Sequence, residues 1–395
     1  MIKYNGTYFL GGTHNMSTKL QEIIDNIEKS GDLYEDAVKE AEARQEVLAK
    51  PTGALGTLED ISIQLAGITG KVKNSMKRQA VVIMSADNGV VEEGVASAPQ
   101  SVTLSQTINF TRHYTGVSSM AKYFGIDLLV VDTGVKLAIP ASLYTDEMIA
   151  YTAKMPHLTD KIVNRRIADG TRNLAKEPAM TEEEALRALM TGMEAAKAVK
   201  DCGYDIFGVG EMGIGNTTTS ACVLAALCGK TGDDVVGRGG GLNDEGLAKK
   251  IHIVDEAING LDPGLVMDIL TKTGGFDICA MTGAFLGAAY YRIPVVIDGY
   301  ISAVAALCAC RLAPNAINFM FGSHLSKEKG YLIAVEALGI KPYFNLGMRL
   351  GEGSGCPISF KIIETACATM NGMATFAEGA IDADYLEEGK KGNFF

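Results

Sequence analysis

DIFGVGEMGIGNTTTSACVLAALCG, residues 205 to 229, contains one complete unit of strand, loop and helix. It opens with a short apolar run typical of a strand, passes through the loop EMGIGN, and ends in an Ala-rich helical segment that Gly229 stops. A strand, a glycine loop and a helix N-terminus in this order predict an anion-binding site, because free backbone N–H groups and the positive end of the helix dipole converge there.

The segments on both sides repeat this alternation of strand and helix. Immediately upstream, Thr181 and Glu184 predict a capping box at the start of a helix that ends before Gly203. Continuous apolar strands separated by helical segments are typical of a parallel sheet covered on both faces. We therefore predict an α/β protein with a Rossmann-like parallel sheet. The expected strands are AVVIM (80–84), DLLVVD (127–132), DIFGVG (205–210), IPVVID (293–298) and AINFMFG (316–322).

Residues 17–49 have a different texture, with many charged residues and apolar side chains at helical spacing. The apolar positions are Leu20, Ile23, Ile24 and Ile27. This pattern predicts surface helices around a small apical core, separate from the sheet.

Composition narrows the class of function. The formal net charge is −11 and no block of consecutive Lys or Arg occurs, which argues against electrostatic binding of nucleic acid or of an anionic membrane. No basic flank followed by an apolar core marks a signal peptide, and the longest apolar run, at 301–310, is about half of a membrane span. We expect a soluble cytoplasmic protein that acts on a small molecule.

The eight cysteines and five histidines do not have the spacing of a metal site. No CxxC pair occurs, and most cysteines lie in Ala-rich apolar runs, which is typical of reduced buried thiols. We therefore expect no metal and no other cofactor.

Four glycine-rich segments follow an apolar run or precede a helix. Such loops gather at the carboxyl edge of a parallel sheet, so together they predict a site for a phosphate-bearing ligand. None has the Gly-Lys-Ser/Thr of a P-loop or the GxGxxG of a dinucleotide fold. The segments are GEMGIGNTTTS (210–220), GRGGGLNDEG (237–246), GGFDICAMTGA (274–284) and RLGEGSG (349–355).

Polar residues beside these loops are candidate ligand contacts. Asn243 is placed to cap a helix, and Lys249 or Lys250, one turn further on, could reach a phosphate while the other is solvated. Asp298 closes an expected strand and points to the same edge, where it could equally cap a helix. SADNGVVEEGVASAPQSVT (85–103) would suit a pocket wall or a plain surface loop.

Several of these motifs, in this order, resemble the nicotinate-nucleotide:dimethylbenzimidazole phosphoribosyltransferase family, from about residue 50 to about 376. The motifs are KPTGALGTLEDISIQLAGI (50–68), the SADNGV loop (85–90), VGEMGIGNTTTSA (209–221), GRGGGLNDEGLAKK (237–250), GGFDICAMTGAFLGAA (274–289), PVVIDGYISAVAAL (294–307), SHLSKEKGY (323–331) and RLGEGSG (349–355).

The resemblance implies a Rossmann-like large domain over 76–359 and a small helical domain built from 1–75 and about 360–395. It implies transfer of the 5-phosphoribosyl group of nicotinate mononucleotide to 5,6-dimethylbenzimidazole or a related benzimidazole or phenol. The products are an α-ribotide, used in cobamide nucleotide-loop assembly, and nicotinate. The family also implies a dimer, which here could pair the chain with itself or with a paralogue.

The resemblance also assigns site residues. Glu352 matches the catalytic base, and Glu211 matches a second acid near the nicotinate and the ribose. The expected substrate contacts are Gly213, Gly215, Asn216, Thr217, Gly239, Gly240, Lys250, Asp298 and Ser326. The expected base pocket is formed by Asp87, Asn88, Gln100 and Leu350.

One departure leaves the acceptor open. The family usually has Asp-His-Gly where this chain has Asp87-Asn88-Gly89, so an amide replaces an imidazole in the segment expected to line the base pocket. Two other functions stay open. One is a phosphoribosyltransferase that uses a diphosphate donor, although Asp132 stands alone where paired acids would be expected. The other is a non-catalytic subunit that sets a partner's choice of base.

Overall fold

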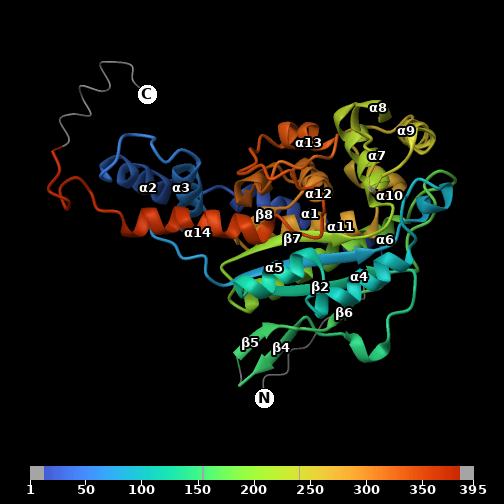
Figure 1. Ribbon diagram of the computed structural model, residues 1–395, viewed down its shortest axis with the longest axis horizontal. Coiled ribbons are helices and arrows are strands. Elements are labelled where there is room, and N and C mark those ends of the chain that lie inside the picture. Colours follow the sequence, from blue (N-terminus) through green and yellow to red (C-terminus); the bar gives the residue numbers. More distant parts are fainter. Residues whose placement is uncertain (1–12, 154, 240, 383–395) are drawn as a thin grey trace.

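The computed structural model describes residues 13–153, 155–239 and 241–382. Its centre is a seven-stranded sheet in which every neighbouring pair is parallel (Figure 1). The predicted α/β fold with a parallel sheet is therefore confirmed. In spatial order the strands are β3 (Tyr144–Thr145), β6 (Ile162–Asn164), β2 (Asp127–Gly134), β1 (Gln79–Ala86), β7 (Ile206–Met212), β8 (Val295–Ile297) and β9 (Met320–Phe321).

The strand order reverses direction between β1 and β7. From β1 the chain builds β2 and β6 on one side, and then returns to place β7, β8 and β9 on the other. All eight residues of β1 are buried, as expected for the centre of a sheet covered on both faces. A crevice opens at such a reversal because the flanking connections leave on opposite faces, so this edge is where a ligand site is expected.

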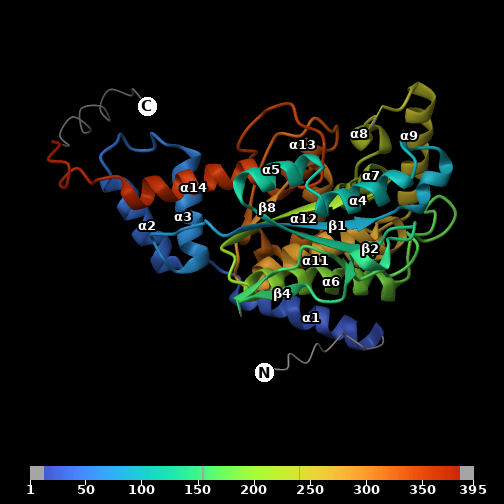
Figure 2. The ribbon, with the colours of Figure 1, turned by 60° about the horizontal axis from the view of Figure 1, so that its bottom comes forward.

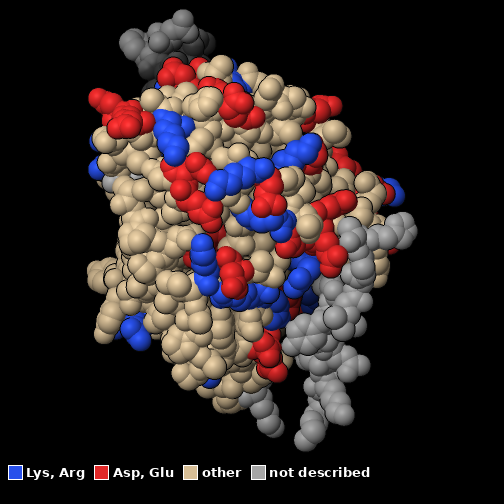
Figure 3. Space-filling view, turned by 90° about the vertical axis from the view of Figure 1, so that its right-hand side faces the viewer, with Lys and Arg blue, Asp and Glu red and all other residues tan. Residues whose placement is uncertain are grey.

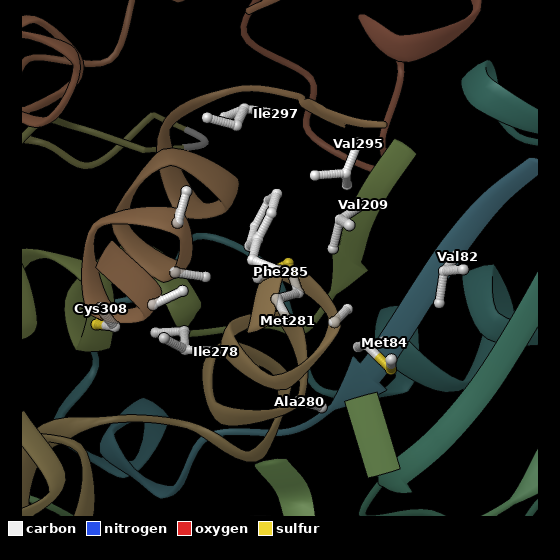
Figure 4. Close-up of a cluster of buried hydrophobic side chains, with 14 of the residues drawn as sticks. Val82, Met84, Val209, Ile278, Ala280, Met281, Phe285, Val295, Ile297 and Cys308 are labelled. Carbon is white, nitrogen blue, oxygen red and sulfur yellow. The ribbon is translucent and has the colours of Figure 1, made fainter. Parts of the chain in front are cut away.

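Helices cover both faces of the sheet. One face carries α6 (Glu182–Asp201), α11 (Phe276–Tyr290) and α12 (Tyr300–Leu312), while the other carries α4 (Ser101–Thr111), α5 (Gly116–Phe124) and α14 (Cys356–Gly372) (Figure 2). In Figure 4, Met281 and Phe285 of α11 lie beside Val209 of β7 within the apolar core. The capping box predicted at Thr181 is present, with Glu184 as its partner.

The helices around the N-terminus divide between two places. The helices α2 (Glu35–Val47) and α3 (Thr57–Thr69) pack with the end of α14 around a second small core of Ala37, Ala41, Ala66 and Met370. In contrast to the expectation for residues 17–49, α1 (Thr13–Ser30) packs on α6 and α11, because Ile23 and Ile27 insert into the main core. The exact domain boundaries stay a prediction.

The remaining segments connect these layers. The expected strand AINFMFG pairs only at Met320–Phe321, because Pro314 begins a 3-10 helix over Pro314–Phe319. A separate antiparallel hairpin joins β4 (Ile149–Thr152) and β5 (Met155–Leu158). The other helices are α7 (Asn216–Cys228), α8 (Gly232–Val235), α9 (Asp244–Ile258), α10 (Val266–Thr273) and α13 (Tyr331–Leu338), and short 3-10 turns span Gly89–Glu93 and Ala141–Leu143.

The surface carries charges of both signs. On the face shown in Figure 3, Lys and Arg lie interleaved with Asp and Glu, so this face offers no continuous basic patch for nucleic acid. Within the described residues, no helix has the length and apolar character needed to cross a membrane. All eight cysteines are free, and burial raises the pKa of Cys222 to about 12.

Candidate functional site

The RLGEGSG loop places a carboxylate at the carboxyl edge of β7. Gly351, Glu352 and Gly353 have φ angles of 83°, 64° and 84°, all in the left-handed region. Glycine adopts this region freely, whereas a glutamate does so at a cost of order 1 kcal/mol. A strained non-glycine residue held between two glycines is typical of a functional position. The loop lies directly on β7, because a Cβ on Gly210 would be 2.4 Å from the Gly353 nitrogen.

The Glu352 side chain points at the start of α5. Its carboxylate accepts hydrogen bonds from Gln106 Nε2 at 3.3 Å and from the Val117 backbone nitrogen at 3.4 Å. Only 4% of the residue is exposed, and burial raises the pKa of Glu352, while the backbone N–H groups of Val117 and Gly116 act against this shift. Burial outweighs the hydrogen-bond donors here, and a carboxylate with a raised pKa is a better proton acceptor than a solvated one.

Glu211, near the end of β7, meets the same loop. Its Oε1 lies 3.4 Å from the Glu352 backbone nitrogen, and its Oε2 accepts a hydrogen bond from Asn216 Nδ2 at the first residue of α7. Burial raises the pKa of Glu211 to about 8, and the nearby carboxyls of Asp277 and Asp298 add to the shift. The two predicted acids are therefore adjacent, although 141 residues separate them.

Asp298 anchors the loop from the end of β8. Its Oδ2 accepts from the Gly353 nitrogen at 2.9 Å and its Oδ1 from the Gly355 nitrogen at 2.6 Å. Burial raises the pKa of Asp298 to about 7, against the effect of these N–H donors. The residue follows β8 as predicted, and its hydrogen bonds position the Glu352 loop.

Lys250 is a buried cation on α9. Its Nζ donates to Thr217 Oγ1 at 2.8 Å, and the residue is only 1% exposed. Burial lowers the pKa of Lys250 to about 8. Within the described residues it forms no ion pair, whereas its neighbour Lys249 is half exposed and pairs with Glu93. A buried ammonium without a carboxylate partner is suited to an anionic ligand.

Two predicted substrate contacts, Thr217 and Gly239, lie beside this cation. A Cβ on Gly239 would lie 3.4 Å from Thr217 Oγ1 and 3.9 Å from Lys250 Nζ, so the glycine leaves space beside both groups. Gly213 and Gly215 form the turn before α7, whose N-cap Gly215 supplies no side-chain hydrogen bond. The first N–H groups of α7 are therefore not capped by a side chain at Gly215. The predicted contact Gly240 lies outside the described residues.

The predicted base-pocket residues occupy two different environments. Asp87 and Asn88 are fully buried: Asp87 accepts from Thr103 Oγ1 at 2.7 Å, and both amide atoms of Asn88 have no partner among the described residues. Gln100 donates to the Asn88 carbonyl at 3.4 Å. Leu350 is instead 58% exposed, beside Glu352. Asn88 lies beneath Gly213 and Gly215, so it would affect a bound base only through the loop that contains these glycines. The role of Asn88 stays a prediction.

The structure adds residues that the sequence did not indicate. Asp277, at the start of α11, is fully buried next to Asn88, and burial raises its pKa to about 7. Gln106 is a hydrogen-bond donor to Glu352, and His324 is buried near Asp298. Asp277 and His324 both belong to motifs quoted above, GGFDICA and SHLSK. The spacing of these motifs along the chain does not show that their side chains lie near the site. No group of three or more described His, Cys, Asp or Glu side chains is arranged for a metal ion.

Together these residues form one site at the reversal between β1 and β7. A buried cation lies beside Thr217 in the first turn of α7, and buried carboxylates lie where α5, β7 and β8 converge. This arrangement can hold a phosphate at one end and accept a proton at the other.

Comparison with known proteins gives consistent matches. A family model described as a phosphoribosyltransferase matches residues 31–381. A nicotinate-nucleotide–dimethylbenzimidazole phosphoribosyltransferase of Clostridium perfringens (strain ATCC 13124) is 53% identical, covering 94% of this chain and 98% of the relative. The same-named protein of Clostridium tetani is 46% identical over 89% and 93% of the two chains.

Two solved structures from Thermus thermophilus have the same fold. The nicotinate-nucleotide–dimethylbenzimidazole phosphoribosyltransferase superposes with a TM-score of 0.79 at 35% identity, covering 88% of this chain and 98% of the other. The structure titled CobT gives a TM-score of 0.81 at 36% identity, covering 88% and 99%.

Proposed function

This chain belongs to the nicotinate-nucleotide–dimethylbenzimidazole phosphoribosyltransferase family, and from that premise we propose how its own residues carry out the transfer. The substrate is nicotinate mononucleotide, and the acceptor is 5,6-dimethylbenzimidazole or a related benzimidazole or phenol. The products are an α-ribotide and nicotinate. The observation that supports this proposal is the junction of Glu211 and Glu352 at the start of α7, where Asn216 donates to Glu211 and the next residue, Thr217, accepts from the buried Lys250.

Glu352 is the general base. One nitrogen of the acceptor azole attacks C1′ of the ribose, while the proton on the other nitrogen passes to the Glu352 carboxylate. The bond from C1′ to the pyridinium nitrogen breaks, and its electron pair neutralises that nitrogen, so no strong acid is needed for the leaving group. Attack from the opposite side inverts C1′ and gives the α product. A phenol acceptor would give its O–H proton to the same carboxylate.

Glu211 and Asp298 support the positively charged centre. The pyridinium of the donor is cationic, and positive charge spreads onto the ribose as the bond to nitrogen breaks. The bound cation would lower the pKa of these buried carboxyls, so that they are ionised in the complex and stabilise a charge that few waters screen. Asp298 also fixes the loop that carries Glu352, through Gly353 and Gly355.

The phosphate of the donor binds at the other end of the site. Lys250 supplies the charge, Thr217 accepts a hydrogen bond from its ammonium, and Gly239 leaves space beside both. We assign Gly213 and Ser326 to the same phosphate contacts. Gly240 belongs to the same proposed group. Phosphate bound here would fix the ribose in line with Glu352.

The test is turnover of nicotinate mononucleotide with a panel of azoles and phenols. The Glu352→Gln variant keeps the size of the side chain but cannot take a proton, so we expect kcat to fall by roughly 10²- to 10⁴-fold. Gln106→Ala, which removes only a donor to the carboxylate, serves as the milder comparison. An unchanged rate in Glu352→Gln would remove Glu352 as the base.

Asn88 and Leu350 are the residues that bear on the identity of the acceptor. Asn88 replaces the usual histidine beneath the loop over 211–216, and Leu350 offers an exposed apolar side chain next to Glu352. We propose a benzimidazole-like or phenolic acceptor, which the panel would rank by kcat/KM.

Exposed apolar side chains precede Glu352 and the helix that donates to it. Leu346 and Leu350 are 66% and 58% exposed, and Tyr114, just before α5, is 75% exposed. These side chains support a dimer, either of two identical chains or with a paralogue, in which a second subunit approaches the site. Light scattering of the purified single chain distinguishes a homodimer from a chain that needs a partner. We propose that the dimer acts in the cytoplasm, where thiols stay reduced.

Two alternatives predict different results in the same assay. A transferase that uses a diphosphate donor would require Mg²⁺ and would not consume nicotinate mononucleotide. A non-catalytic partner subunit would be inactive as a single chain, although its Glu352 and glycine loops are intact.

A further inference from the structure

His324 is a buried side chain that the proposed reaction does not use. The residue follows β9 and is 1% exposed, and its ring lies between the starts of two helices. A Cβ on Gly355, the N-cap of α14, would be 2.4 Å from Nδ1, and a Cβ on Gly299, the N-cap of α12, would be 3.5 Å from Nε2. Nε2 has no hydrogen-bond partner among the described residues, which is rare for a buried polar atom.

The neighbours of Nδ1 determine which ring nitrogen carries the proton. The Ser323 hydroxyl donates to the Asp298 carbonyl oxygen at 2.5 Å, so its oxygen is left to accept. His324 Nδ1 lies 3.2 Å from this oxygen and 3.8 Å from Asp298 Oδ1, and both are acceptors. Nδ1 therefore carries the hydrogen, and Nε2 presents a lone pair. Burial lowers the pKa of His324 to about 4, so the ring is neutral at pH 7.

The free lone pair borders a small space beside Gly299. The position that a Cβ on Gly299 would occupy is 3.4 Å from His324 Cε1, 3.5 Å from Nε2 and 3.9 Å from Ser326 Oγ. Ser326 belongs to the proposed phosphate contacts, while Asp298, on the other side of Gly299, holds the Glu352 loop. The space therefore lies between Ser326, a proposed phosphate contact, and Asp298, which holds the loop of the proposed base Glu352.

We propose that His324 Nε2 accepts a hydrogen bond from a ribose hydroxyl of the phosphoribosyl donor and thereby selects ribose over deoxyribose. A neutral imidazole lone pair repels a phosphate oxygen but accepts a hydroxyl hydrogen, which excludes the phosphate itself as the partner. The inference rests on the proposed function, because it assigns part of the same donor. It makes His324 a residue that determines specificity, separate from the general base.

The experiment compares three donors: nicotinate mononucleotide and its 2′-deoxy and 3′-deoxy forms. In His324→Phe the ring volume is kept and the acceptor is lost, so kcat/KM for the ribose donor should fall roughly 10-fold or more. For the deoxy donor that lacks the bound hydroxyl, kcat/KM should stay at the wild-type value. The ratio of kcat/KM for the ribose donor to kcat/KM for this deoxy donor should therefore fall toward one in the variant. His324→Gln, which can present an oxygen acceptor near the same place, should recover part of the ratio.

If His324 had only a structural role, His324→Phe would lower kcat/KM equally for all three donors. That result would overturn the proposal even where the variant is active. Wild-type protein that does not distinguish either deoxy donor would overturn it without any variant. If the wild-type chain consumes no nicotinate mononucleotide, the proposed function fails first, which is a separate outcome.

Gly299→Ala gives an independent test that leaves His324 in place. The added methyl would meet the protein at ordinary contact distances, so the fold should be kept. It would, however, occupy the space assigned to the hydroxyl, and KM for nicotinate mononucleotide should rise several-fold. An unchanged KM in a folded Gly299→Ala protein would contradict the placement of the ribose.

Discussion

At the scale of single residues, Glu211 links catalysis to stability through one proton. In the unfolded chain this carboxyl would lose its proton near the ordinary value of 4.5, whereas the folded protein holds it to about pH 8. The folded state therefore binds more protons between these values, and its free energy of unfolding falls as pH rises through them. Glu211→Gln should match the wild-type Tm near pH 5 and exceed it near pH 8, while kcat falls. A Tm difference that does not change with pH would contradict this account.

Lys250 should set the alkaline limit of substrate binding. Its pKa, lowered to about 8 by burial, means that the ammonium is lost above that pH, so kcat/KM for nicotinate mononucleotide should decline there. The substrate phosphate has its second pKa near 6 and cannot cause this decline. Lys250→Met should lower kcat/KM roughly 10- to 100-fold at pH 7 and should abolish the decline of kcat/KM at alkaline pH. The exposed neighbour in Lys249→Met is the matched control, and an equal loss there would remove the special role of Lys250.

At the scale of elements, the Glu352 loop packs directly on the backbone of β7. A Cβ on Gly210 would lie 2.4 Å from the Gly353 nitrogen and 2.6 Å from the Glu352 carbonyl carbon, and neither backbone atom can move freely. Gly210→Ala should therefore lower the free energy of unfolding by about 1–3 kcal/mol and reduce kcat more than 10-fold. Gly372→Ala, at the end of α14, where a Cβ would meet nothing within 4 Å, should leave kcat unchanged and should not lower the free energy of unfolding. Urea unfolding and kcat together check both variants.

The elements themselves could be predicted where the local pattern was strong. The capping box at Thr181, the strand over Ile206–Met212 and the helix that Gly229 stops all follow from residues close together in sequence. By contrast, the donors to Glu352 come from α4 and α5, more than 200 residues away, and no local pattern links them. His324 could be found in a motif, but its free lone pair depends on how Ser323 and Asp298 are arranged in space.

At the scale of the whole molecule, α14 joins the site to the small helical cluster. The helix begins at the Glu352 loop, crosses the sheet, and ends against α2 and α3 (Figure 1). Its far end is fixed by Arg44, whose Nε donates to the Met370 carbonyl at 2.9 Å. The small cluster therefore supports one wall of the site from a distance, although it supplies none of the carboxylates.

A second connection between the N-terminal helices and the sheet lies at the opposite, amino edge. Arg292 donates to the carbonyls of Ser30 at 2.6 Å and Asp32 at 3.0 Å, and its guanidinium lies 4.1 Å from the Tyr34 ring. Because these contacts lie just before β8, Arg292→Gln should lower the free energy of unfolding by about 2 kcal/mol and leave kcat/KM within twofold of wild type. Urea unfolding beside steady-state kinetics tests this separation. A parallel loss of activity would show that the two edges of the sheet are coupled, and that α1 and α3 help to shape the site.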